Sequence, residues 1–252
     1  MGQSERNYYG SLCAELYEIL HEKPPQDELD FYLSYARKGE KIWEPLCGNG
    51  RFLIPFLQRG MDIQGMDLSA PMLQKLKQKA PGAKAICADL TEYCPRETFH
   101  YIVIPSSSVS LFTDQEGLRK ALRNIKQALA PGGKFVFSVE AEAGRRPDDA
   151  GWRMAAAVQT KEGFDLTLRE KSRYDRQSRI QFLPGVYELR RDGRLIQREE
   201  MDFQIRLYRL GEMEKILGEI GFGPIQTYSS FCKETAVGGE CEMFLFECGA
   251  GR

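Results

Sequence analysis

Histidine is scarce in this sequence: only His21 and His100 occur among 252 residues, and no two of the seven cysteines are spaced Cys-x-x-Cys. Because zinc is bound mainly by closely spaced histidines and cysteines, we expect no metal site. No apolar run approaches the ~18 residues of a membrane helix, so we expect no membrane partner. The odd number of cysteines, several of them in apolar runs, predicts reduced thiols and a cytoplasmic protein.

The chain also lacks an excess of charge of either sign. It has 35 basic and 36 acidic residues and a formal net charge of -1. This balance gives no electrostatic reason to expect a nucleic-acid partner. Hydrophobic residues make up 42%, and the length suits one large domain, alone or with an elaboration.

Strand-like and helix-like segments alternate through the first half of the chain. Two N-terminal helices are expected at 11–22 and 26–37. The strands that follow are expected at 41–45, 62–67, 83–87, 100–105 and 134–140, with helices near 51–59, 70–80 and 115–129. After a helix at 211–221, two further strands at 222–230 and 241–248 would complete the sheet. This order predicts an α/β fold, a doubly wound, seven-stranded and mostly parallel sheet with helices on both faces.

Between these parts the pattern changes to strands with one buried face. Residues 141–151 indicate a loop, and strand patterning follows at 164–174, 179–190 and 195–209, with a hairpin signal at Asp192-Gly193. We therefore predict a core of residues 1–140 and 211–252, and an inserted antiparallel β-sheet at 141–210. The insertion could roof a substrate pocket or form a homodimer.

The most informative segment is Ile42-Trp43-Glu44-Pro45-Leu46-Cys47-Gly48-Asn49-Gly50-Arg51, in which a strand ends at an acid and a glycine-rich turn leads into a helix. Such a turn lets a ligand approach bare backbone at the carboxyl end of a parallel strand. Asp67 ends the next strand, and Asp89 ends the third. Three acids at three successive strand ends predict a ligand site along one edge of the sheet.

These residues resemble the cofactor site of class I, Rossmann-like methyltransferases that use S-adenosylmethionine (SAM). The resemblance covers residues 35–140 and, more loosely, 211–248; it departs at Leu46, where the family often has its first glycine. It implies SAM as cofactor, S-adenosylhomocysteine as product, a small-molecule acceptor and an N-terminal helical lid.

The resemblance also implies roles for individual residues. Asp67 would accept hydrogen bonds from the ribose hydroxyls, Asp89 from the adenine amino group, and Glu44 would face the ammonium group. Leu68 and Met72 would pack on the adenine. The remaining expected cofactor contacts are Leu46, Gly48, Asn49, Gly50, Arg51, Leu90, Pro105 and Tyr8.

The acceptor side is less defined by the sequence. The expected substrate contacts are Tyr9, Ser108, Trp152 and Arg173, and the weak catalytic candidates are Glu140, Tyr9 and Ser106. A neutral amine needs little base catalysis, whereas a phenol or alcohol would need a general base. Since neither histidine is expected near the site, an amine acceptor is favoured.

Other functions remain open at this point. A nicotinamide-binding enzyme would need a third glycine after Gly50, where Arg51, Phe52 and Leu53 stand instead. A nucleic-acid or protein methyltransferase could use the same core, although Ile104-Pro105-Ser106-Ser107 differs from the Asn-Pro-Pro-Tyr motif of base-amine methylation. A non-catalytic scaffold or sensor that binds SAM or its product would retain the same acids.

Overall fold

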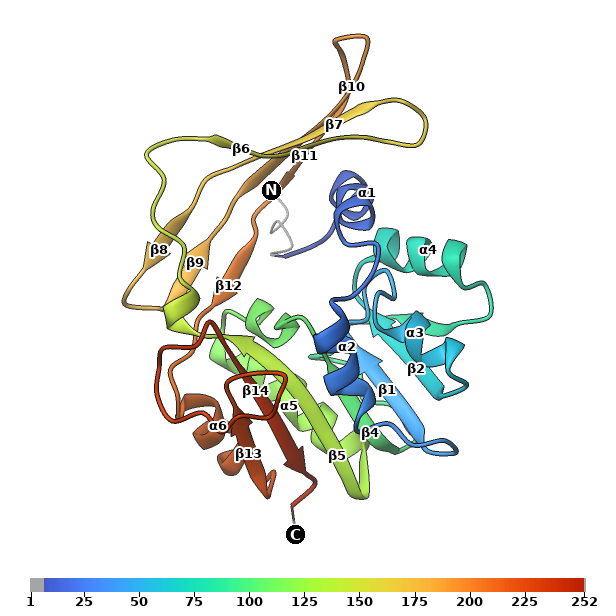
Figure 1. The fold of residues 1–252 in the computed structure, drawn as a ribbon, viewed down its shortest axis with the longest axis vertical. Coiled ribbons are helices and arrows are strands. Elements are labelled where there is room, and N and C mark those ends of the chain that lie inside the picture. The colour runs from blue at the N-terminus through green and yellow to red at the C-terminus, as the bar shows by residue number, and fades with distance from the viewer. Residues whose placement is uncertain (1–6, 252) are drawn as a thin grey trace.

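The computed structural model describes residues 7–251, and its largest element is a seven-stranded sheet with the order β13-β14-β5-β4-β1-β2-β3 (Figure 1). The first five strands pair in parallel, whereas β14 runs antiparallel to both β5 and β13. Their bounds are β1 Lys41–Pro45, β2 Asp62–Asp67, β3 Lys84–Cys87, β4 Phe99–Ile104, β5 Leu129–Glu140, β13 Ile225–Tyr228 and β14 Met243–Gly249. The predicted α/β class and sheet are confirmed.

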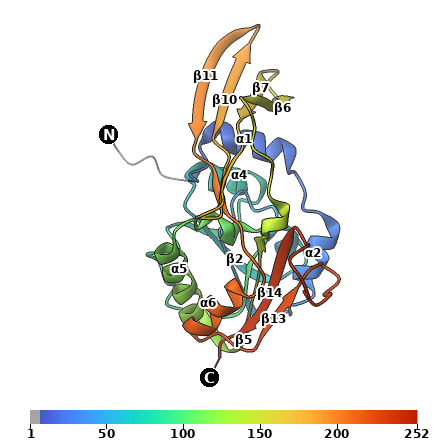
Figure 2. The same ribbon diagram turned by 90° about the vertical axis from the view of Figure 1, so that its left-hand side faces the viewer.

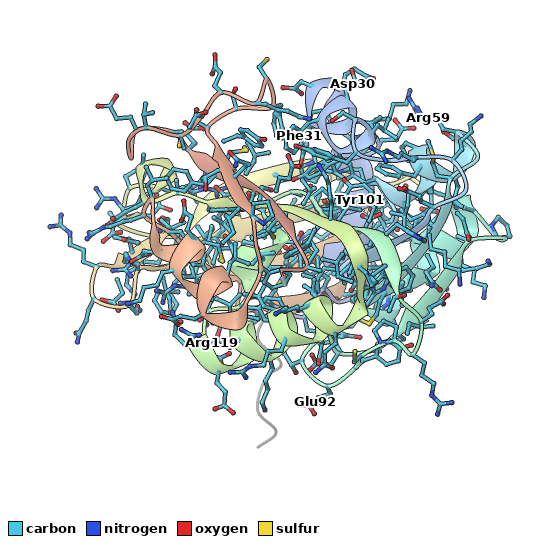
Figure 3. All side chains as sticks on the ribbon, turned by 90° about the horizontal axis from the view of Figure 1, so that it is seen from below. Asp30, Phe31, Arg59, Glu92, Tyr101 and Arg119 are labelled. Atoms are coloured by element: carbon cyan, nitrogen blue, oxygen red, sulfur yellow. The ribbon has the colours of Figure 1, made fainter. Side chains whose placement is uncertain are left out.

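Helices cover both faces of this sheet and enclose two separate cores. On one face α5 (Gln115–Ala128) and α6 (Glu212–Ile220) pack over β4, β5 and β14. On the other lie α2 (Gln26–Leu33), α3 (Leu53–Gln58) and α4 (Ala70–Lys79). Seen from below, Tyr101 lies within the sheet layer, whereas Arg119 and Glu92 lie at the surface (Figure 3). No helix within residues 7–251 is long and apolar enough to cross a membrane.

Local sequence signals fix the helix starts around the sheet. Ser69 caps α4 by accepting the N–H of Met72, and Asp114 caps α5 by accepting the N–H of Gly117. The apolar residues of α5 recur at helical spacing and are buried. They are Leu118, Ala121, Leu122, Ile125 and Ala128. Both helices therefore begin within a residue of their predicted starts.

The segment between β5 and α6 forms two smaller antiparallel sheets. The four-stranded roof sheet has the order β11-β10-β7-β6, and a three-stranded sheet, β12-β9-β8, connects it to the core (Figure 1). Their bounds are β6 Arg153–Gln159, β7 Asp165–Glu170, β8 Arg173–Asp175, β9 Ile180–Phe182, β10 Gly185–Arg191, β11 Arg194–Met201 and β12 Gln204–Arg206. All seven strands lie within the predicted insertion.

Each of the three strands predicted in this region divides between the two sheets. Residues 164–174 form β7 and β8, residues 179–190 form β9 and β10, and residues 195–209 form β11 and β12. Strand β6 was not predicted at all. Three consecutive alanines, 155–157, occupy its centre, and alanine is depleted in strands, so its pairing with β7 decides its structure.

Helix α1 (Ser11–Leu20) lies between the roof sheet and the core (Figures 1 and 2). Its apolar face packs on the roof in a third hydrophobic cluster, formed by Leu12, Cys13, Leu16, Leu166, Tyr187 and Met201. Two ion pairs, Glu15–Lys75 and Glu18–Lys79, join it to α4 in the core. The helix thus bridges the two parts of the molecule.

Candidate functional site

The three strand-end acids meet in one cavity. Glu44 in β1, Asp67 at the end of β2 and Asp89 just after β3 all line a hollow of about 270 Å³ at the carboxyl edge of the sheet. Because parallel strands end at the same edge, residues far apart in sequence converge there. The N-terminal segment and α1 close the cavity with Tyr8, Tyr9 and Tyr17.

The turn after β1 is held in left-handed backbone conformations. Gly48 and Gly50 have φ of 53° and 77°, and a Cβ on Gly50 would lie 2.3 Å from Leu76. Leu46 also has a positive φ, 63°. This residue replaces the glycine that the family often has there, so the turn keeps the glycine-like conformation at some steric cost. The sequence departure therefore leaves the shape of the turn intact.

Asp67 is oriented by the backbone around it. Its carboxylate accepts the N–H groups of Gly48 and Ser69, each at 2.8 Å. Burial raises the pKa of Asp67, and these backbone donors oppose the rise. Asp89 is oriented in the same manner, because its Oδ1 accepts both the N–H and the hydroxyl of Thr91. Both carboxylates retain lone pairs for a ligand.

Two ionisable side chains in the cavity wall each have a buried polar atom without a hydrogen-bond partner. Glu44 is 2% exposed, and its Oε2 has no hydrogen-bond partner. Burial, reinforced by the nearby charge of Asp67, holds its pKa well above the usual range. The Nε of Arg51 is also buried without a partner, while its guanidinium contacts the rings of Tyr17 and Phe52. No carboxylate of the described residues forms an ion pair with Arg51.

This arrangement fits a zwitterion such as the methionine end of SAM. A buried acid with a free oxygen can accept from an ammonium group, and a buried guanidinium can hold a carboxylate. The acids at the ends of β2 and β3 line the same cavity. Their expected contacts with the ribose and the adenine stay predictions.

The turn after β4 forms another wall of the cavity. Pro105, Ser106 and Ser108 line it, and the side chain of Arg51 donates to Ser106 Oγ at 2.5 Å. Ser106 and Ser107 have φ of 57° and 53°, a conformation that non-glycine residues seldom adopt. This rare backbone geometry lies beside the expected path of the acceptor.

Most of the predicted contact residues line this cavity. They are Tyr8, Tyr9, Glu44, Leu46, Gly48, Asn49, Arg51, Asp67, Leu68, Met72, Asp89, Leu90, Pro105, Ser106 and Ser108. Gly50 does not line it, and a Cβ there would lie 2.3 Å from Leu76. Burial raises the pKa of Glu140, which does not line the cavity either. Arg173 stacks on Phe182, and Trp152 lines a separate groove on the roof, so the roles of these three remain predictions.

Two long-range contacts that shape the site could not be foreseen from the sequence. Asn7 has a positive φ and ties the N-terminal segment to the backbone of Leu111 and Gln204. Asn49 donates to Glu18 of α1 at 2.7 Å, which joins the glycine turn to the helix above it. Each contact joins residues at least 31 positions apart, and no local pattern indicates such pairs.

Comparison with known proteins agrees with this site. A profile of the methyltransferase domain family matches residues 42–133, which contain the glycine turn and all three acids. The dTDP-3-amino-3,4,6-trideoxy-alpha-D-glucopyranose N,N-dimethyltransferase of Streptomyces venezuelae is 27% identical over 110 residues, which cover 44% of this chain and 46% of that protein. The matched segment spans about half the length of such curated relatives.

Solved structures are similar over nearly the whole chain. A SAM-dependent methyltransferase from Clostridium acetobutylicum has a TM-score of 0.76 at 16% identity, with 95% of this chain and 98% of that chain covered. The sugar N-methyltransferase KedS8 from Streptoalloteichus has a TM-score of 0.74 at 17% identity, with 100% and 99% covered. At these identities the likeness shows the fold, including the arrangement of the insertion.

Proposed function

We propose that this protein transfers a methyl group from SAM to an amine of a small molecule, because residues 42–133 match the methyltransferase domain family and the fold is similar to that of a SAM-dependent methyltransferase. The observation that carries the proposal is the convergence of Glu44, Asp67 and Asp89, with the unpaired Arg51, in one cavity. These four residues offer a partner to each polar part of the cofactor.

The amine as acceptor rests on two lines of support. Of the proteins named above, one is by name an N,N-dimethyltransferase of an amino-sugar nucleotide and another a sugar N-methyltransferase. In addition, neither histidine lines the cavity. His100 is the second residue of β4, and its Nδ1 accepts the N–H of Lys41 at the opposite edge of the sheet. His21 follows α1, and its ring lies 4.6 Å from that of Tyr17. Nucleophiles that need a strong base are therefore less well served than a neutral amine.

The chemistry that SAM supplies is an activated methyl group that an amine nitrogen can displace in line. The protein's part is to orient the two reactants and to exclude water. Tyr9 is suited to this, because its backbone oxygen accepts from Ser69 and its ring packs edge-on against Tyr17 and Phe203. Burial holds the pKa of Tyr9 well above its usual range, so it stays a neutral donor beside the acceptor.

The test combines binding with transfer. Calorimetric titration with SAM and with S-adenosylhomocysteine should give micromolar affinity, and transfer of labelled methyl should follow with amino sugars and simple amines. Matched hydroxyl analogues serve as the control for the acceptor atom. Transfer to hydroxyl but not amine compounds would refute the amine, binding without any transfer would favour a non-catalytic SAM-binding protein, and no binding would refute the proposal.

A further inference from the structure

Glu28, on helix α2, is a buried carboxylate outside the cavity described above. It is 6% exposed, and only one other carboxylate of the described residues, Glu44, is as fully buried. Its Oε1 accepts the backbone N–H of Ser106 at 2.8 Å, although the two residues lie 78 positions apart. A buried acid is costly unless it is satisfied, so this contact calls for an explanation.

The contact holds a strained turn. Ser106 and Ser107 are consecutive non-glycine residues with positive φ, and such strain persists only where the surroundings fix the backbone. Glu28 fixes Ser106, and the hydroxyl oxygen of Ser138 accepts the N–H of Ser107 at 2.8 Å. Tyr32 of the same helix contacts Ser138 through a hydroxyl hydrogen bond of 3.1 Å. Helix α2 therefore supports both strained residues.

The strained turn at Ser106 also contacts Arg51, an expected cofactor contact. The hydroxyl oxygen of Ser106 accepts from Arg51 Nη2, and this is the single hydrogen bond that the Arg51 side chain makes among the described residues. The guanidinium also lies over the rings of Tyr17 and Phe52, at 5.7 and 5.2 Å from their centroids, and neither ring accepts a directional hydrogen bond from it. The orientation of Arg51 thus depends on where Ser106 is held.

We propose that Glu28 is a positioning residue of the site, which acts through Ser106 to orient Arg51 and the wall that faces the acceptor. This inference rests on the proposed function for the meaning of Arg51 as a cofactor contact. To hold the Ser106 N–H, residue 28 needs an acceptor oxygen at the end of a side chain as long as that of glutamate. The negative charge of Glu28 is not needed for this contact. Burial raises the pKa of Glu28, against the opposing effects of the Ser106 N–H and Arg51, and the neutral acid would still accept the hydrogen bond.

Two variants of the full chain distinguish the length of the Glu28 side chain from its charge, and a third serves as the control. Glu28→Gln keeps an oxygen at the same distance without the charge, whereas Glu28→Asp keeps the charge but is shorter by one methylene. Asp30→Ala, on the exposed face of the same helix, is the matched control. The readouts are amide hydrogen exchange of the segment containing Ser106 and Ser107, and the affinity for S-adenosylhomocysteine by calorimetry.

Glu28→Asp should accelerate exchange at this turn and weaken S-adenosylhomocysteine by about 5- to 30-fold, the scale of one lost buried hydrogen bond. Glu28→Gln and Asp30→Ala should resemble the wild type in both measurements. A loss in Glu28→Gln with retention in Glu28→Asp would overturn the proposal, as would an unchanged turn in Glu28→Asp. If the wild type failed to bind S-adenosylhomocysteine, the proposed function would fall, while the exchange measurement would still test the role of Glu28.

Discussion

At the scale of single residues, Asp67 is the most direct test of the cofactor site. Its two oxygens are already oriented by Gly48 and Ser69, so a ribose bound beside them would gain hydrogen bonds without reordering the side chain. Asp67→Asn should weaken SAM by ~1–3 kcal/mol, the usual scale of a hydrogen bond to a charged group. Calorimetry measures the change, and Asp62→Asn at the exposed start of the same strand is the control. Equal affinities of both variants would contradict the assignment.

Glu44 leads to a prediction about stability and pH. Because burial raises its pKa in the folded protein, the unfolded chain loses this proton at lower pH than the folded one. The contribution of neutral Glu44 to the free energy of unfolding is thus fully present below the ordinary glutamate pKa of about 4.3. It declines as the pH rises towards the raised pKa of Glu44 in the folded protein. Without ligand, Glu44→Gln should melt at a higher temperature than the wild type near pH 7, and this difference should vanish near pH 4.

The same substitution should weaken binding, since the free oxygen of Glu44 is the expected partner of the ligand's ammonium group. Thermal unfolding between pH 4 and 8, with and without S-adenosylhomocysteine, measures both effects. Glu22→Gln, on an exposed residue after α1, controls for the change of net charge. A variant that is less stable than wild type at neutral pH would refute the argument.

Which of these residues could be foreseen depends on how local their signal is. Glu44, Asp67 and Asp89 stand at the ends of successive predicted strands, so the alternation of strands and helices along the sequence was enough to identify them. Glu28 and Asn7 reach the site from other elements, and their neighbours in sequence carry no trace of that contact. The positive φ of Leu46 was hidden for a related reason, because a turn fixed by its surroundings can tolerate a residue that local preference disfavours.

At the scale of elements, helix α1 depends on the roof sheet for its N-terminal cap. Gly10 offers no side chain, and the carboxylate of Glu199 in β11 accepts the N–H groups of Leu12 and Cys13 instead. A Cβ on Gly10 would lie 2.5 Å from that carboxylate, so the glycine makes room for the distant cap. The charge of Glu199 also complements the positive end of the helix dipole.

Removing this cap should loosen the cover of the cavity. Glu199→Ala should cost α1 ~0.5–2 kcal/mol, speed amide exchange across residues 11–20 and accelerate release of S-adenosylhomocysteine. Glu200→Ala is a matched control, because Glu200 pairs with Arg198 and accepts no hydrogen bond from the helix. Exchange and stopped-flow release measure the two effects. If both variants released ligand at the same rate, α1 would not act as a lid.

The elements also mark the limit of pattern recognition in this chain. Most core helices and strands were predicted within a few residues because they bury a regular apolar face; β3 and β13, which bury little, were located by their place in the alternation of strands and helices. Strand β6 was missed, since its alanines carry little preference and the partner strand β7 determines its pairing. The three strands expected at 164–174, 179–190 and 195–209 each divide between the two smaller sheets, because strand patterning continues through a change of sheet, which side-chain period alone does not reveal.

At the scale of the whole molecule, the insertion carries four exposed large apolar side chains among the described residues. Trp152 and Met154 are 46% and 56% exposed, and Leu195 and Ile196 near the end of the hairpin are 48% and 55% exposed. Trp152 borders a groove of about 510 Å³ that also contains Arg169, Glu188, Arg198 and Glu200. Exposed apolar groups beside charges of both signs are typical of an interaction surface that can complement itself. We propose that the roof mediates a homodimer.

Light scattering should then give about twice the chain mass of 28.7 kDa. Met154→Glu should shift the protein towards the monomer, because two like charges would approach at a twofold interface. Val237→Glu is the control: it introduces the same charge at a residue 93% exposed, in the loop before β14. In a Trp43→Phe background only Trp152 remains to fluoresce, and its emission should move to shorter wavelength as dimers form. A monomer at all concentrations, or dimers equally stable in both glutamate variants, would refute the homodimer.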